Sequence, residues 1–228
     1  MKCFGARFAL PNEKNQVMRK IAIRHLMTAL LIAVAAPFVK AQVHVGDILC
    51  EGDVVVSPAG FAIAEHNPIG VVFYVDATRQ HGWAVGLNDL GEYAWGPNWL
   101  DTPLRNFTGL QQAVNDYNGY SHTKTIIEAG FAIEFPAIDS LDFENGWYLP
   151  AIGQLKRLYA NMEKVEASLS EVGGSTFSSN GEWEYWSSTE YSLCNAWFID
   201  YLGKLHFKDV TYNGSKDGRR FVRAVINF

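Results

Sequence analysis

A basic stretch followed by a short apolar run near the N-terminus limits what this 228-residue chain can fold into, because it predicts that a large piece is removed. Residues 18–25 are rich in arginine and lysine, and residues 26–39 are apolar apart from one threonine. The small residues Val39 and Ala41 then stand just before Gln42. This order is typical of a secretory signal peptide, and the run is shorter than the roughly 20 apolar residues of a membrane-spanning helix. We therefore predict an exported chain that is periplasmic, cell-surface or extracellular.

The boundary after Ala41 divides the chain into two predicted parts. Residues 1–41 are a signal peptide with an upstream extension, because residues 1–17 are polar and without a period, and we expect translation to begin at Met18. Residues 42–228 form a single domain, since about 187 residues fit the usual range of roughly 50–250. We do not expect the mature chain to insert into a membrane.

Removal of residues 1–41 changes the charge of the chain. It takes away seven of the 19 basic residues but one of the 24 acidic residues, so the net charge moves from −5 to about −11. A polyanion such as nucleic acid needs clustered lysines and arginines, and the densest cluster is Arg219, Arg220 and Arg223. Nucleic acid and anionic membrane surfaces are therefore not expected as partners.

Two of the three cysteines, Cys50 and Cys194, remain in the mature chain. An even number of cysteines in an exported protein is compatible with a disulfide. This pair is therefore a candidate disulfide, and two free buried thiols are the alternative. Neither cysteine has a histidine close in sequence, which argues against a metal site. We predict no metal and no other cofactor.

The mature chain shows strand patterns, then helical patterns, then strand patterns again. Residues 46–56 indicate strand, turn and strand, and residues 70–76 and 81–87 a hairpin. A loop rich in aromatic residues, 88–107, leads to helical periods over 109–117, 121–131 and a longer segment from Leu149–Pro150 to Gly173. The short strands that follow are 183–187, 196–201, 204–210 and 221–228. This order predicts an α+β fold with an antiparallel sheet.

Four short motifs follow one another across residues 147–228. They are Trp147–Leu155 (WYLPAIGQL), Tyr185–Tyr191 (YWSSTEY), Ala196–Gly203 (AWFIDYLG) and Arg220–Val225 (RFVRAV). In this order they resemble the Lcl C-terminal domain family, the C-type-lectin-like domain of bacterial collagen-like adhesins. The opening Gly46–Cys50 is similar to exported proteins of gut Bacteroidetes.

The resemblance implies a C-type-lectin-like fold. Such a fold has a twisted antiparallel sheet with two or three flanking helices and long loops, and its closing strand pairs with the opening strand, here near residues 46–56. We expect the motif residues to be structural, with the three tryptophans as core anchors because large aromatic side chains dominate core burial. The hydroxyls are expected to satisfy local backbone groups rather than act as nucleophiles. The residues concerned are Trp147, Leu149, Pro150, Trp186, Ser187, Ser188, Thr189, Trp197 and Arg223.

The same family implies a surface adhesin that binds a glycan or a protein. Aromatic side chains next to Asn, Asp and Glu suit sugar stacking combined with hydrogen bonding, and a packed loop whose tryptophans fill the core is the alternative. The negative charge argues against sulfated polyanions, and the calcium-binding signatures of lectins with this fold are missing from the sequence. The candidate ligand-binding residues are Tyr93, Trp95, Trp99, Asn180, Glu182, Trp183 and Glu184.

Two further roles are open. The chain can be a structural or tip subunit of a fimbria, or of a phage-like receptor-binding assembly. An enzyme of the formylglycine-generating type uses the same broad fold but needs a reactive cysteine pair, whereas Cys50 and Cys194 lie in unrelated contexts. The sequence also lacks Gly-x-Ser-x-Gly, His-Glu-x-x-His and phosphate-binding glycine motifs. We therefore predict a non-catalytic protein with no catalytic residues.

Overall fold

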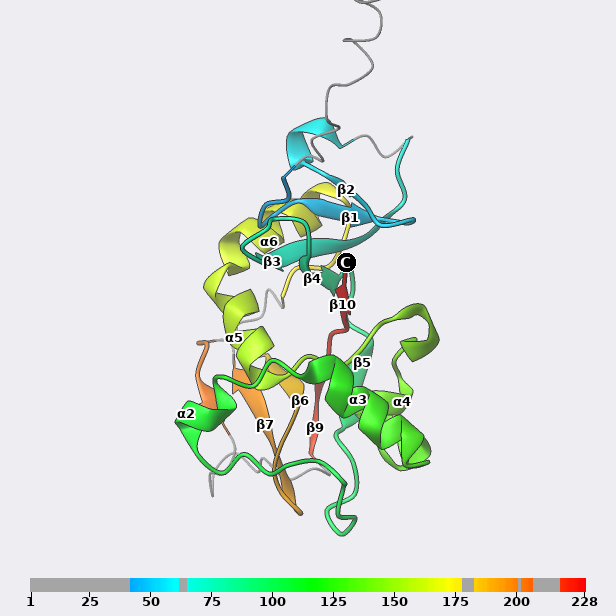
Figure 1. The fold of residues 1–228 in the computed structure, drawn as a ribbon, viewed down its shortest axis with the longest axis vertical. Helices are drawn as coiled ribbons and strands as arrows, with labels where there is room; N and C mark the ends of the chain where they lie inside the picture. Colours follow the sequence, from blue (N-terminus) through cyan, green and yellow to red (C-terminus); the bar gives the residue numbers. More distant parts are fainter. Residues whose placement is uncertain (1–41, 62–64, 178–182, 201, 207–217) are drawn as a thin grey trace, which may run out of the picture. The chain divides into compact units, whose positions relative to one another are not determined.

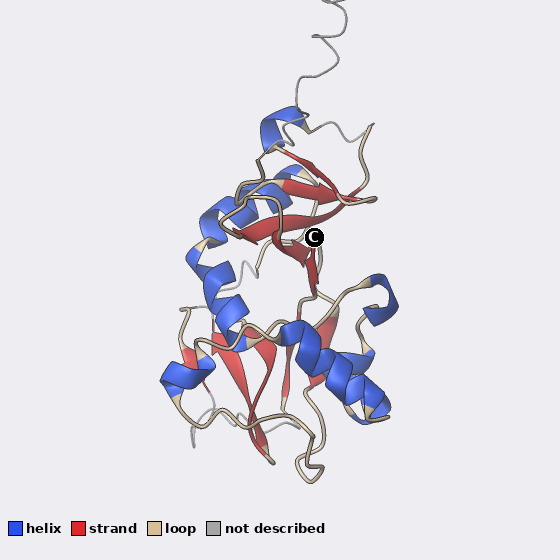
Figure 2. Cartoon of the chain, in the orientation of Figure 1, coloured by secondary structure: helices blue, strands red, loops and turns tan. Residues whose placement is uncertain are grey.

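The computed structural model describes residues 42–61, 65–177, 183–200, 202–206 and 218–228. Residues 42–228 make one compact unit. The predicted signal peptide and the start site at Met18 lie outside the described residues. Along the unit, a run of strands is followed by the α-helices and then by a second run of strands, and the strands gather into two sheets of five (Figures 1 and 2).

The first sheet has the strand order β10–β4–β3–β1–β2. Its strands are β1 (Ile48–Cys50), β2 (Val54–Val56), β3 (Pro68–Val75), β4 (Gly82–Gly86) and β10 (Val225–Asn227). All four neighbouring pairs are antiparallel. β1 is fully buried, as are Val71, Val72 and Phe73 of β3. A short 3-10 helix, η1 (Pro58–Gly60), follows β2.

The second sheet has the order β5–β9–β6–β7–β8. It contains β5 (Gly91–Ala94), β6 (Glu184–Ser192), β7 (Asn195–Asp200), β8 (Leu205–His206) and β9 (Arg219–Val222). The sheet is mixed, because β6 and β9 run parallel whereas the other pairs are antiparallel. The chain leaves this sheet after β9 and enters the first sheet as β10, so residues 223–224 connect the two.

Helices lie between and beside the sheets (Figure 1). α5 contacts β3 of the first sheet and both β6 and β7 of the second, while α3 contacts β6 and α4 contacts β5. The helical bounds are α2 (Leu110–Ala113), α3 (Gly119–Glu128), α4 (Pro136–Asp139), α5 (Ile152–Ala160) and α6 (Met162–Glu171), with 3-10 turns η2 (Ala132–Glu134) and η3 (Phe143–Asn145). The largest apolar cluster joins β3, α5, α6, β6 and β7, so α5 is the element that ties both sheets to one core.

The α+β class is confirmed, but three details of the prediction are wrong. The closing strand β10 pairs with β4, and β4 and β3 separate it from the opening strand β1. The longer predicted helix is two helices that meet at Asn161, whose backbone leaves the helical region. The loop 88–107 contains a strand, β5, that pairs with β9.

Gly153 lies at the start of α5, where helix propensity and packing predict opposite effects of an alanine substitution on stability. A Cβ at Gly153 would lie 2.4 Å from the carbonyl oxygen of Asp116 and 2.8 Å from that of Val114. Backbone atoms cannot rotate away, so we expect Gly153→Ala to lower the free energy of unfolding by about 1–3 kcal/mol. Propensity alone predicts a gain of about 1 kcal/mol. Urea unfolding followed by circular dichroism measures the sign.

The matched control is Lys156→Ala, an exposed position of the same helix. We expect this change to stay within about 0.5 kcal/mol of the wild type. A Gly153→Ala protein more stable than the wild type would show that the contact between α5 and residues 114–116 is not tight.

Candidate functional site

The loop 88–107, which the sequence predicts to be a ligand surface, contains both buried and exposed aromatic side chains. Trp95 is completely buried, its indole Nε1 donates to the carbonyl of Ser187 at 2.7 Å, and its ring packs edge-on against Phe135. This placement corrects the prediction that Trp95 contacts a ligand, because it fills the core as in the packed-loop alternative. Trp99, in contrast, is 70% exposed, and Tyr93 is half-buried on β5.

Of the second proposed segment, the structure describes Trp183 and Glu184. Asn180 and Glu182 lie outside the described residues. Trp183 is buried in the largest core cluster, which corrects its assignment as a ligand contact. Glu184 is partly exposed and its Oε2 lies 2.9 Å from Nε of Arg220, whose guanidinium lies over the rings of Trp186 and Phe198. Glu184 therefore neutralises a buried arginine.

The motif hydroxyls and two motif tryptophans lie inside the second sheet. Trp186 and Trp197 are fully buried, and their Nε1 atoms donate to the carbonyls of Tyr93 (2.9 Å) and Phe107 (2.7 Å). Ser187 donates to the carbonyl of Trp197, and Thr189 accepts a hydrogen bond from the backbone of Ile152. Leu149 and Pro150 are also buried.

A serine, a histidine and an aspartate come together beneath α3, a proximity that sequence reasoning missed. Nδ1 of His122 lies 3.2 Å from Oγ of Ser188 and 3.7 Å from Oδ2 of Asp116. All three side chains are buried. In a catalytic relay the acid and the hydroxyl contact opposite ring nitrogens, whereas here both lie near the same one. Asp116 also accepts a hydrogen bond of 2.6 Å from Thr189, so the group joins α3 to β6.

This cluster predicts a pH dependence of stability. Burial lowers the pKa of His122, and the nearby Asp116 opposes that shift only in part. The unfolded chain, with an ordinary histidine pKa of about 6.5, then binds the proton more readily than the folded chain. The free energy of unfolding should therefore decrease as the pH falls below about 6.5.

Urea unfolding at pH 7.5, 6.5 and 5.5 measures this dependence. The comparison is with His122→Gln, which cannot titrate, so the difference between the two slopes isolates His122 from the other histidines. An equal decrease in both proteins between pH 6.5 and 5.5 would contradict the assignment.

Cys50 and Cys194 are both free thiols. Cys50 is buried on β1, where burial raises the pKa of its thiol. Cys194 is exposed in the turn between β6 and β7, and its Sγ lies 3.2 Å from the carbonyl oxygen of Asn98. The candidate disulfide is therefore not formed. The alternative, two free buried thiols, is correct for Cys50, whereas Cys194 is free but exposed.

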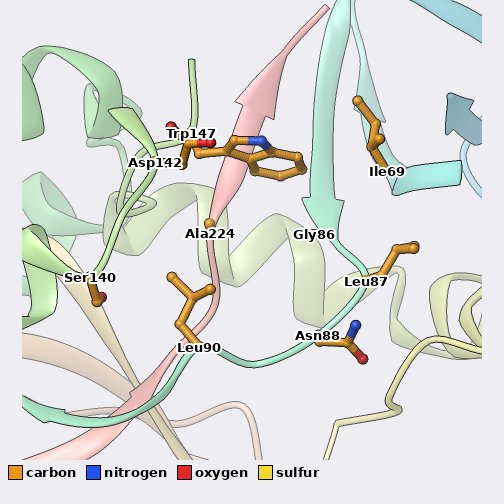
Figure 3. Close-up of a pocket in the computed structure, with 9 residues that line it drawn as sticks. All are labelled: Ile69, Gly86, Leu87, Asn88, Leu90, Ser140, Asp142, Trp147 and Ala224. Atoms are coloured by element: carbon orange, nitrogen blue, oxygen red, sulfur yellow. The ribbon is translucent and has the colours of Figure 1, made fainter. Parts of the chain in front are cut away.

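An open pocket of about 370 Å³ lies where the chain passes between the sheets (Figure 3). Trp147, predicted to be a core anchor, is only half-buried and its ring lines this pocket. A Cβ at Gly86 would lie 3.3 Å from the ring, so the glycine allows the indole to lie against β4. The other lining residues are Ile69, Leu87, Asn88, Leu90, Ser140, Asp142 and Ala224.

Arg223 fixes the segment that forms one side of this pocket. It is 1% exposed, and its guanidinium donates to the carbonyls of Gly86 (3.0 Å), Leu87 (2.7 Å) and Ser175 (2.7 Å). Its Nη1 also lies 3.2 Å from Asp89. Burial raises the pKa of Asp89, and Arg223 partly offsets that rise. The motif arginine thus joins residues 86–89 to the segment after α6.

Within the described ranges, no three side chains of His, Cys, Asp or Glu come close enough together to hold a metal ion. Among the same residues, no helix is both long enough and apolar enough to cross a membrane.

No family model matches the chain, and no curated protein matches it. A fimbrial protein from Bacteroides ovatus has a similar structure, with a TM-score of 0.64 and 18% sequence identity over 82% of this chain. The match covers 49% of that protein, so this chain spans about half its length. At this identity the likeness establishes that the two chains share a fold.

Proposed function

We propose that this chain is an exported, non-catalytic subunit of a fimbria-like appendage on the cell surface. The observation that carries the proposal is the fold shared with a fimbrial protein across 82% of the chain. The signal-like N-terminus supports it, because an appendage subunit must be exported. The buried Ser188, His122 and Asp116 serve packing in this proposal.

The finer proposal is that the fold is C-type-lectin-like and related to the Lcl C-terminal domain family. Its support is the ordered set of four motifs, whose central tryptophans Trp186 and Trp197 are buried and hydrogen-bonded. The mixed second sheet and the pairing of β10 with β4 are the features that a solved structure of a family member should share.

Shearing of the native cells tests the appendage role. An antibody against residues 42–228 should detect the chain in the sheared, ultracentrifuged appendage fraction and decorate filaments in electron micrographs. A soluble periplasmic protein probed in the same fractions is the control for cell lysis. Size-exclusion chromatography of the purified mature chain adds a second readout. A chain found wholly with the periplasmic control, and monomeric at all concentrations, would refute the proposal.

A second candidate role is recognition of a glycan or a protein by the appendage. It is favoured by Trp99, which is 70% exposed, and by Leu193, which is 41% exposed. The contact between Cys194 and Asn98 brings their two loops together. Exposed aromatic and aliphatic side chains that gather at one place mark interaction surfaces. A glycan array and a pull-down, each repeated with Trp99→Ala, test this role.

A further inference from the structure

The pocket beside Trp147 has the composition of a site for one sugar ring. We propose that it binds a neutral hexopyranose residue, as a free glycoside or at the end of a glycan. Its volume of about 370 Å³ lies at the small end of the roughly 300–1,000 Å³ of small-molecule pockets. An indole ring forms part of the wall, and aliphatic side chains from β3 and the loop after β4 complete it (Figure 3). This inference deepens the recognition role proposed above and rests on it.

Polar groups at the pocket have hydrogen-bonding capacity to spare. Asn88 uses its Oδ1 to accept from the backbone of Ser175, and Asp142 uses its Oδ2 to accept from Asn145. The Nδ2 of Asn88 and the Oδ1 of Asp142 have no hydrogen bond to any other described residue. The side chains of Asn88 and Asp142 therefore keep one donor group and one charged acceptor for a ligand of the pocket that they line.

This set of groups distinguishes a sugar from an apolar ligand. A lipid chain or an aliphatic side chain would cover Asn88 and Asp142 without offering them a hydrogen bond, and a covered polar group left unpaired is costly. A pyranose presents C–H groups on one face, which suit an indole, and hydroxyls around its rim, which suit an amide and a carboxylate. The carboxylate of Asp142 repels sulfated or uronic sugars, so the ligand is neutral.

The pocket is also held in place before any ligand binds. Arg223 bonds the carbonyls of Gly86 and Leu87, and the backbone of Tyr148, next to Trp147, pairs with Val225 of β10. Both sides of the pocket thus belong to hydrogen-bonded structure rather than to free loops. A preformed site loses less conformational entropy on binding.

Saturation-transfer NMR with a panel of methyl glycosides of glucose, galactose, mannose and N-acetylglucosamine tests the proposal. The protein is residues 42–228, the compact unit. At least one glycoside should bind, Trp147→Ala should weaken it about tenfold or more, and Asp142→Asn should weaken it about fivefold because a charged acceptor is lost. Lys156→Ala, at an exposed position of α5 that does not line the pocket, should bind as the wild type does. Circular dichroism and thermal midpoints confirm that each variant is folded, and Asp142 is exposed enough to be changed safely.

Two results would overturn the inference. One is the absence of binding by every glycoside of the panel. The other is binding that survives both Trp147→Ala and Asp142→Asn, including the case in which Trp99→Ala abolishes it and so moves the site to the loop. Neither result affects the appendage proposal, because that proposal is tested by cell fractionation and filament labelling.

Discussion

Replacing Arg223 by methionine is expected to lower the free energy of unfolding by about 3–5 kcal/mol, the usual loss when one partner of a buried ion pair is removed. Arg223 donates to three backbone carbonyls and contacts Asp89, and it lies over the ring of Phe177. Methionine fills much of the same space but bonds none of these oxygens. The loss therefore comes from unpaired polar groups rather than from a cavity.

The Arg223→Met change should also alter the pH dependence in a defined direction. Arg223 lowers the pKa of Asp89, so its removal raises that pKa further above the unfolded value. The folded variant then takes up a proton more readily than the unfolded chain as the pH falls. The stability difference from the wild type should therefore be smaller near pH 4 than at pH 7. Tyr185, which donates to both oxygens of Asp89 at 2.9 Å, remains as a partner.

Urea unfolding at the two pH values measures both effects. Arg219→Met is the matched control, because Arg219 is exposed on β9, four residues before Arg223, and contacts the carbonyl of Glu92. We expect it to change the free energy of unfolding by less than about 1 kcal/mol. Equal losses for the two arginines would mean that Arg223 does not hold residues 86–89 in the way that the geometry indicates.

The class of the fold was predictable from local patterns, but the order of its strands was not. Apolar runs with β-branched and aromatic residues, bounded by turn residues, located β3 and β4 as a hairpin, and a helical period located α5 and α6. Strand order depends on contacts between residues far apart in sequence, such as Val225 with Val85. A local pattern carries no information on such a pair. The expected pairing of the closing strand with β1 came from the resemblance and is wrong for this chain.

In the candidate site, the burial of single side chains was likewise not predictable from the local sequence. Trp147, Trp186 and Trp197 all belong to the motifs, and nothing in their local sequence separates a wall of a pocket from a core anchor. Whether each tryptophan is buried depends on the residue against which its ring packs. Trp147 lies against Gly86, a residue 61 positions earlier, where the missing side chain leaves room beside the ring. Trp95 and Trp99, four residues apart, likewise have opposite exposure because Trp95 meets Phe135 and Trp99 meets solvent.

Replacing Trp197 by alanine is expected to lower the free energy of unfolding by about 3–5 kcal/mol, as for other buried tryptophans. The ring is fully buried, packs edge-on against Tyr191, and bonds the carbonyl of Phe107. The change creates a cavity and also leaves that carbonyl unpaired.

We expect Trp197→Ala also to increase the mobility of the loop that ends at Phe107. Trp197 and the carbonyl of Glu190, which accepts from the backbone of Phe107 at 2.9 Å, both hold the end of this loop. Limited proteolysis should therefore cut residues 95–109 faster in Trp197→Ala than in the wild type. The expected faster cleavage links the buried motif to the position of the exposed Trp99.

Trp99→Ala separates burial from residue type in this experiment. It removes the same ring from a position that is 70% exposed, so we expect a change within about 0.5 kcal/mol. Trp197→Phe should fall between the two, at about 1–3 kcal/mol, because it keeps an aromatic ring and loses the hydrogen bond. If Trp197→Phe were as stable as the wild type, the bond to Phe107 would contribute nothing, and ring burial alone would hold this loop against β7.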